Sequence, residues 1–375
     1  MTAGLLEHRS LLRARYPAAM IRLSGAVPLA IVVLVVAGCG GGHRAEPPGT
    51  TSATAPPASR PVRRTPAHST VARPFAPTAV WNLRLPDDAA LDPRSHELVR
   101  AFVADIARQR KAAIGPWIQT TNSSSPVYTV PRGQRRVPVV LDVREAYGRT
   151  LRRAFRSVPL PSTARPAQGP DRHLTLLQPA TDSMWEFWHL RRENGRWRAA
   201  WGGAMRNVST NPGYFTRGSW PGGEPYWGAT ATSLPLIAGL IRISELERGR
   251  IDHALAIAIP NARAKAAAWP AQRTDGTLSA PVALPEGARL RLDPKLDIAA
   301  LDLPPAVRAI AVAAQRYGLI VRDKTLHATG FFAEDPTPSG RNPYPRLFGG
   351  RTPGELLARF PWEHLQLVKM RLRAS

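Results

Sequence analysis

Cysteine is the residue type that this chain most nearly lacks, because the only one among its 375 residues is Cys39. A single cysteine excludes an intramolecular disulfide and a zinc site built from cysteines. The sequence also contains no HExxH pattern, no phosphate-cradling glycine loop and no nucleophile elbow. We therefore expect no metal and no cofactor.

Acidic residues and lysine are scarce, so the chain is strongly basic. Asp and Glu number 27 against 51 Lys and Arg, which gives a formal net charge of +24. This charge favours anionic partners such as lipid headgroups, acidic polysaccharide or nucleic acid. An arginine-rich composition also arises in GC-rich genomes without any such partner. No basic run exceeds two residues and no nucleic-acid motif is present, so we expect no nucleic-acid partner.

The amino terminus has the features of a secretory signal peptide over residues 1–38. Several arginines precede an apolar run from Ala26 to Val36, which is too short for a comfortable membrane span. The segment Val36-Ala37-Gly38-Cys39 resembles the lipobox of bacterial lipoproteins. That resemblance implies cleavage before Cys39 and acylation of its sulfur, which would anchor an extracytoplasmic protein to the bacterial cell membrane. The alternatives are an ordinary signal peptide with an incidental cysteine, or an uncleaved anchor.

Residues 39–74 are rich in Gly, Pro, Ala, Ser and Thr with scattered Arg, and they show no hydrophobic period. Such a composition predicts a disordered tether. Residues 75–375 contain no second linker, so we expect them to form one domain.

Short strand patterns separated by turn residues dominate this domain. They cover residues 117–120, 126–130, 136–141, 174–177, 184–190, 196–201, 204–208, 253–259, 265–269, 288–292, 319–321 and 365–372. Strands at this spacing predict a mainly β fold, and more specifically an antiparallel β-sandwich or jelly-roll-like single domain. A few peripheral helices are expected at residues 92–110, 244–249 and 302–318, and residues 352–355 are expected to cap a last helix.

The stretch from Tyr226 to Pro260 is the most distinctive in the sequence. It contains a run of very small residues, Gly228–Ser233, which suits close approach of either another backbone or a ligand. Ser244–Glu247 matches a capping box, and Gly249 is suited to end the short helix. Leu255, Ile257 and Ile259 alternate with alanines, which predicts a central strand with an apolar residue on each face.

Glu186 is a candidate acid for sugar chemistry. Alternation along its strand places Glu186 and Trp188 on one face. A sugar ring can stack on a Trp while a carboxyl group of raised pKa donates a proton. The alternative is a strand carboxylate paired with one of the many arginines.

His253, at the start of the central strand, is a second candidate. It could act as a general base or a ligand donor, oriented by Asp252 or Asp171. It could equally be a core histidine bonded to backbone or to a carboxylate. Asp171 and His173 flank Arg172 before another strand, where they could contribute to a site or to a salt-bridged strand start.

Four aromatic residues are candidates for a stacking platform. Trp188, Tyr226, Trp227 and Trp269 lie near glycines or polar residues on predicted strands and loops. Such rings favour a glycan groove, although they could also belong to the core.

The order of several motifs resembles that in an uncharacterised family of secreted bacterial proteins, many of which occur beside carbohydrate-associated modules. The motifs are Asp171-Arg172-His173, Trp185-Glu186, Trp197 with Gly202-Gly203, Asn207–Ser209, Gly228–Arg242, Gly249–Ala254, Trp269–Ala271 and Tyr317-Gly318. The similarity runs from about Val80 to the C-terminus. It implies a secreted β-rich module with a link to glycans and supplies no catalytic residues. The chain departs from the pattern at Arg322-Asp323-Lys324.

These observations predict a membrane-anchored extracytoplasmic lipoprotein whose β-rich domain binds cell-envelope or environmental polysaccharide. One alternative is a polysaccharide lyase or glycoside hydrolase that uses Glu186 and His253. Another is a structural cell-envelope protein without a small ligand.

Overall fold

Strand β9 (Leu255–Ile259) separates two hydrophobic cores. Every residue of the strand is buried. Leu255, Ile257 and Ile259 pack into one core, whereas Ala256 and Ala258 pack into the other. The alternation in the sequence therefore predicted correctly that this strand is central, because side chains along a strand point to opposite faces.

The structure, a computed structural model, describes residues 73–374, and these belong to one compact unit, Arg63–Ser375. The predictions for the signal peptide, for Cys39 and for nearly all of the tether lie outside the described residues. Across residues 73–374, no helix combines the length and apolar character needed to cross a membrane.

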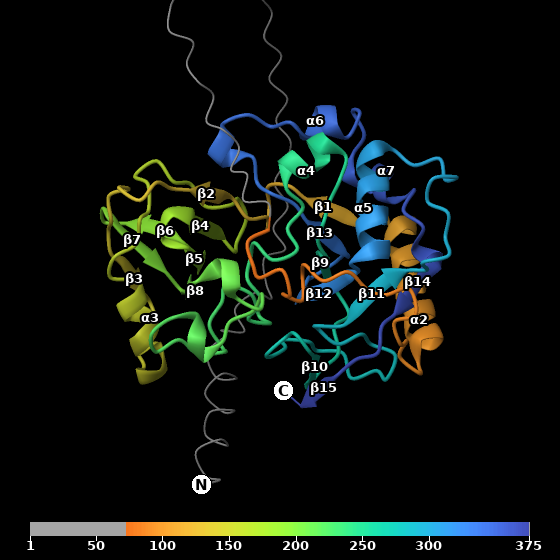
Figure 1. Cartoon of the computed structure of the whole chain (residues 1–375), viewed down its shortest axis with the longest axis horizontal. Coiled ribbons are helices and arrows are strands. Elements are labelled where there is room, and N and C mark those ends of the chain that lie inside the picture. Colours follow the sequence, from red (N-terminus) through yellow and green to blue (C-terminus); the bar gives the residue numbers. More distant parts are fainter. Residues whose placement is uncertain (1–72, 375) are drawn as a thin grey trace, which may run out of the picture. The chain divides into compact units, whose positions relative to one another are not determined.

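The sheet that contains β9 has the strand order β1-β13-β9-β12-β11-β14 (Figure 1). Its other strands are β1 (Trp117–Gln119), β13 (Gly330–Phe332), β12 (Leu319–Lys324), β11 (Arg289–Leu292) and β14 (Leu365–Leu367). Strand β9 pairs with β12 in parallel and with β13 in antiparallel orientation, and β1 pairs with β13 in parallel. The sheet is therefore mixed.

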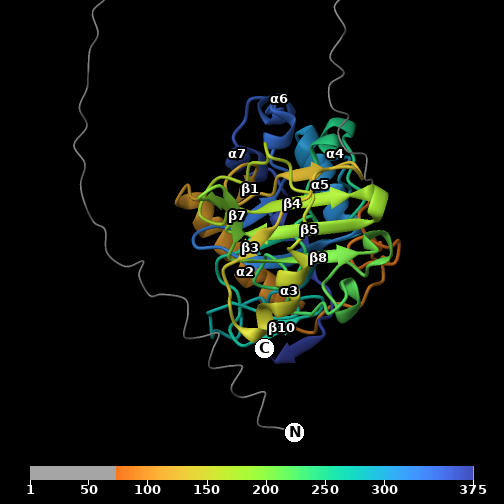
Figure 2. The same ribbon diagram turned by 90° about the vertical axis from the view of Figure 1, so that its left-hand side faces the viewer.

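A second sheet has the order β2-β4-β5-β8 and is seen face-on in Figure 2. Its strands are β2 (Val127–Thr129), β4 (Leu174–Gln178), β5 (Ser183–Trp188) and β8 (Trp201–Arg206). Two smaller sheets have the orders β3-β7-β6 and β10-β15. They consist of β3 (Val139–Leu141), β7 (Arg196–Ala199), β6 (Arg191–Glu193), β10 (Ala266–Ala268) and β15 (Leu372–Ala374).

The helices are short apart from two. They are α2 (Ser95–Lys111), α3 (Arg149–Ala154), α4 (Ile243–Arg248), α5 (Pro305–Arg316), α6 (Tyr344–Leu347) and α7 (Pro353–Leu357). Helix α5 buries Val307, Ile310 and Ala314 in the same core as the Leu/Ile face of β9. Gly249 ends α4 with a φ of 67°, as its position in the sequence predicted.

Two details of the sequence prediction were wrong. Three of the four described sheets are mixed, whereas we expected antiparallel pairing; β2 and β4 pair in parallel, as do β3 and β7. Helix α4 begins at Ile243, and the carboxylate that accepts the N-cap amide of Arg242 belongs to Glu245. The predicted capping box at Ser244–Glu247 was therefore placed two residues too late; the N-cap is Arg242, which the Ser/Thr-based pattern cannot detect.

Candidate functional site

The small-residue run Gly228–Ser233 is a buried connection between the two larger sheets, and Glu186 of β5 holds it in place. One carboxylate oxygen of Glu186 accepts from the amide of Ala229 at 2.7 Å, and the other accepts from Leu236 at 2.8 Å. Gly203 of β8 lies so close that a Cβ there would be 3.1 Å from the nitrogen of Gly228. The run therefore serves the close approach of backbone to backbone.

Arg322 of β12 supports the same connection. Its Nη1 donates to the carbonyls of Leu236 at 2.6 Å and Ala238 at 3.1 Å, and its guanidinium lies 3.7 Å from the ring centroid of Phe332. Burial lowers the pKa of Arg322 to about 10. Burial also raises the pKa of Glu186 to about 7, against its two amide hydrogen bonds. Because Glu186 is fully buried, it cannot meet a sugar ring.

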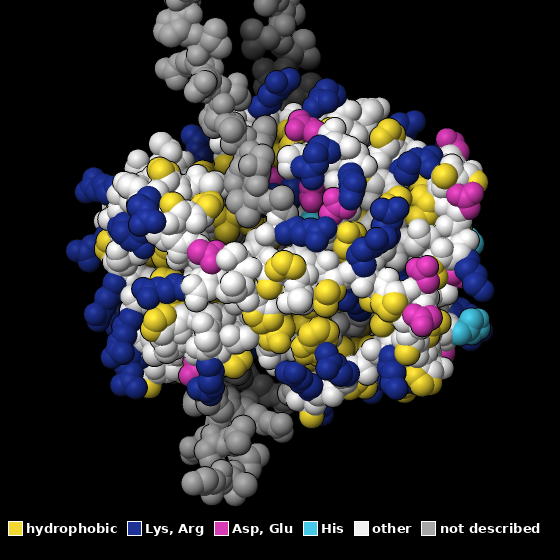
Figure 3. Space-filling view, viewed as in Figure 1, with side chains coloured by type: hydrophobic (Ala, Val, Ile, Leu, Met, Phe, Trp, Pro, Cys, Tyr) yellow, Lys and Arg dark blue, Asp and Glu magenta, His cyan; other side chains and the backbone are white. Residues whose placement is uncertain are grey.

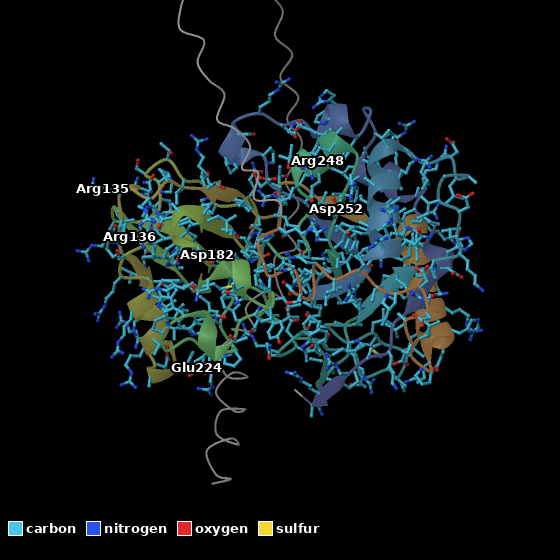
Figure 4. The ribbon with its side chains drawn as sticks, viewed as in Figure 1. Arg135, Arg136, Asp182, Glu224, Arg248 and Asp252 are labelled. Carbon is cyan, nitrogen blue, oxygen red and sulfur yellow. The ribbon has the colours of Figure 1, made fainter. Side chains whose placement is uncertain are left out.

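His253 belongs to a separate hydrogen-bond network. Its Nε2 lies 3.1 Å from a carboxylate oxygen of Glu245, and its Nδ1 lies 2.8 Å from the carbonyl of Ala254. Burial opposes protonation of His253, but the charge and hydrogen bond of Glu245 outweigh it and raise its pKa. Asp252, seen beyond the end of α4 in Figure 4, instead accepts from Arg250 at 2.8 Å. Asp252 therefore does not orient His253, which is the core histidine of the alternative interpretation; among residues 73–374, no hydrogen bond joins it to Glu186.

Asp171 and Trp188 do meet, as a carboxylate against an aromatic ring. The indole nitrogen of Trp188 donates to Asp171 at 3.2 Å, and Ser123 donates to the other oxygen at 3.2 Å. Both Asp171 and Trp188 are partly exposed. His173 is buried nearby, and this burial lowers its pKa to about 4, so it is neutral near pH 7.

The four candidate platform aromatics do not form one surface. Trp227 is fully buried and belongs to the core. Tyr226 is partly exposed and stacks on Trp201, with ring centroids 6.4 Å apart. Trp269 is covered by Arg371, whose guanidinium carbon lies 4.3 Å from the ring centroid. Only separate rings, rather than a continuous platform, are therefore accessible to a ligand.

Three carboxylates that are remote in sequence converge into an acidic cluster, Asp275, Glu286 and Asp323. One oxygen from each lies within 4.8 Å of one from each of the others, which is compatible with holding a metal ion. Asp275 is exposed, Asp323 is partly buried and Glu286 is fully buried. The three carboxylates thus extend from the protein surface at Asp275 to the buried interior at Glu286.

Burial and mutual repulsion raise the pKa of two carboxyl groups in the acidic cluster. Burial, reinforced by the charges of Asp323 and Asp275, raises the pKa of Glu286 to about 9. Burial, followed by the charge of Asp275, raises the pKa of Asp323 to about 7. Carboxylates held this close favour either a shared proton or a bound cation, since each ionised group destabilises the next.

A groove with a volume of about 500 Å³ opens elsewhere, beside β6 and β7. We call it the arginine groove; its lining comprises residues 164–169, Arg172, residues 190–192 and Trp197. Four of these residues are arginines and none is acidic. Figure 3 shows Lys and Arg side chains gathered over the edge where Figure 1 draws β3, β6 and β7.

The arginines of the groove differ in how firmly they are held. Arg191 is fixed by Asp142, with nitrogen–oxygen distances of 2.8 and 3.3 Å. The guanidinium of Arg192 lies 5.4 Å from the ring centroid of Trp197. Arg165, Arg172 and Arg192 are exposed. The groove therefore contains exposed guanidinium groups, and some of its arginines are held in place by Asp142 or Trp197.

Sequence reasoning named Asp171, His173 and Trp188 as separate candidates, and it missed both their proximity and Glu286 and the groove. Glu286 follows a proline in a loop, and no residue spacing in the sequence distinguishes it. Arg191 and Arg192 lie on β6, a strand that the sequence pattern did not predict. No family model matches the chain, and comparisons with curated proteins and with solved structures find no significant match.

Proposed function

We propose that this protein is a membrane-anchored extracytoplasmic lipoprotein whose β-rich domain binds acidic glycan in the arginine groove. The observation that carries the proposal is a groove lined by four arginines and no acidic residue. The motifs that resemble those of secreted, carbohydrate-associated proteins support the glycan class. The lipobox at Cys39 supports the location.

The groove has the size and chemistry that an acidic sugar requires. Its volume of about 500 Å³ falls within the range of small-ligand sites, roughly 300–1,000 Å³. A guanidinium can donate two parallel hydrogen bonds to a carboxylate or sulfate group. Stacking on Trp197 restricts the motion of Arg192, so less entropy is lost when it binds an anion.

The lyase or hydrolase alternative loses the residue pair on which it depended. Glu186 and His253 are both buried, and each is bonded to partners that the other does not share. A catalytic acid and base must both reach the scissile bond. Binding is therefore the function that the geometry supports best.

For the architecture we propose a sandwich-like packing of the two larger sheets around the core that contains Ala256 and Ala258. This proposal rests on the shared core, which includes Leu176 of β4, Trp185 of β5 and Ile320 of β12.

A glycan array with matched variants tests the function. Wild-type residues 73–375 should bind uronate-containing or sulfated glycans and not their neutral counterparts. Arg172→Glu combined with Arg192→Glu should weaken binding at least about tenfold, because each charge-assisted contact contributes roughly 1.5–3 kcal/mol. Binding should also fall as salt is raised.

Arg84→Glu is the control, because Arg84 is exposed and lies outside the groove. Each Arg→Glu substitution changes the net charge of the protein by the same amount. Equal loss of binding in the control would attribute the affinity to net charge and contradict the groove. Absence of binding to every glycan would favour a structural envelope protein. Reducing ends or unsaturated products in the same assay would revive the enzyme alternative.

A further inference from the structure

The acidic cluster of Asp275, Glu286 and Asp323 lies in the loops and on β12, apart from the residues that line the arginine groove. We propose that it is a divalent-cation site that prefers Ca²⁺. The proposal is independent of glycan binding and rests on four features of the cluster.

The first feature is the spacing of the carboxylate oxygens. All three ligand atoms lie within 4.8 Å of one another. Two oxygens bound to the same Ca²⁺ lie at most roughly 5 Å apart, because each Ca–O bond is 2.3–2.6 Å long. For Mg²⁺ the corresponding limit is roughly 4.2 Å. The spacing is therefore compatible with Ca²⁺, whereas Mg²⁺ requires a closer approach of the same oxygens.

The second feature is a buried oxygen of Glu286 that lacks a partner. Glu286 is 0% exposed. Its Oε2 accepts from the hydroxyl of Thr274 and from the amide of Asp275, at 3.0 Å for the amide. Its Oε1 is buried and has no hydrogen-bond partner among the residues that the structure describes. A buried, unpaired carboxylate oxygen is costly, and a cation at the cluster would satisfy it.

The third feature is that compensation by positive charge is weak. Among residues 73–374, no ion pair joins the three carboxylates to Lys or Arg. Arg322, the neighbour of Asp323 in sequence, favours ionisation of Asp323 through its charge, but its Nη1 donates to the carbonyls of Leu236 and Ala238. Most of the negative charge of the cluster is therefore left for a bound cation or protons to neutralise.

The fourth feature is access. Asp275 is exposed and Asp323 is partly buried, so a hydrated ion can enter from solvent and retain water molecules on its open side. Calcium takes six to eight oxygen ligands, and the three carboxylates leave room for water among them. This combination of one buried and one exposed carboxylate suits a site that exchanges its ion with the medium.

The test is equilibrium dialysis with radioactive Ca²⁺, together with thermal unfolding in EDTA, Mg²⁺ or Ca²⁺. We expect a single Ca²⁺ ion to bind and Ca²⁺ at about 100 times Kd to raise Tm by roughly 5 °C, with a smaller rise in Mg²⁺. Asp275→Asn should fold, because Asp275 is exposed, and should weaken Ca²⁺ binding at least about tenfold. Asp88→Asn, at an exposed acid elsewhere, should bind as the wild type does.

Two results would overturn the proposal. If no Ca²⁺ binds and Tm is the same in EDTA and Ca²⁺, the charge of the cluster is neutralised by protons alone. If Asp275→Asn and wild type bind Ca²⁺ equally, the ion is held somewhere else. Neither result bears on the arginine groove, whose ligand is tested separately.

Discussion

At the scale of single residues, buried charged groups are used to hold backbone in place. Glu186 receives two amides and Arg322 donates to two carbonyls, all within residues 229–238. A segment of this kind has no strand partners of its own, so its polar backbone groups need side-chain partners when they are buried. The carboxylate that resembled a catalytic acid in the sequence is therefore a structural group.

The raised pKa of Glu186 makes folding stability depend on pH. Its pKa is about 7 in the folded protein, above the ordinary value of 4.5. Between these values the folded protein retains a proton that the unfolded chain has lost, so this contribution to stability falls as pH rises. The slope is roughly 1.4 kcal/mol per pH unit.

Glu186→Gln should remove this slope, although it costs one amide hydrogen bond. Urea unfolding at several pH values from 4.5 to 7 would show the stability of the variant approaching, or passing, that of the wild type as pH rises. Asp88→Asn, at an exposed position, should leave the difference constant. A constant difference for Glu186→Gln as well would contradict the raised pKa.

At the scale of elements, β9 and the turn that precedes α4 are packed without spare room. Gly239 has a φ of 67°, and a Cβ there would lie 2.4 Å from the nitrogen of Ala256 and 2.4 Å from the ring of Trp81. Gly249 has the same φ, but nothing lies within 4 Å of its Cβ position. Substituting Gly249 therefore tests the cost of the backbone conformation alone, whereas substituting Gly239 tests that cost together with steric overlap.

Gly239→Ala should destabilise the domain far more than Gly249→Ala. The second substitution costs only the left-handed backbone conformation, roughly 1 kcal/mol. The first adds overpacking against β9 and should cost at least about 2 kcal/mol more. Urea denaturation of both variants measures the difference, and equal losses would show that the packing around Gly239 is loose.

At the scale of the whole molecule, we propose that the N-terminal segment before the described residues sets where the domain acts. The lipobox predicts that acyl chains on Cys39 attach the protein to the membrane, since two or three chains bind far more stably than one. Glycan binding by the arginine groove would then tether the envelope or its surroundings to the membrane.

Cys39→Ser in the full-length chain should move the protein from the membrane fraction to the soluble fraction of the producing cell. The expected cause is the loss of the sulfur that carries lipid. A change of Cys39 leaves the arginine groove intact, so the released protein should bind glycan as residues 73–375 do. Unchanged fractionation would contradict lipidation at this position.

The sequence by itself determined most of the strands, the two-faced burial of β9 and the end of α4 at Gly249. These features depend on the local spacing of residues. The two-residue alternation of side chains indicates a strand, and the position of a glycine indicates the end of a helix. It also identified Asp171 and Trp188 as candidate site residues, because they lie in neighbouring motifs.

Only the tertiary structure decided which charged groups meet. Asp275, Glu286 and Asp323 come from separate segments, and their convergence depends on how those segments pack rather than on local pattern. The mixed pairing of β9 with β12 and β13 likewise depends on contacts between residues far apart in the chain. Burial, which turned Glu186 and His253 into structural groups, is a property of the packed molecule and cannot be inferred from residue type alone.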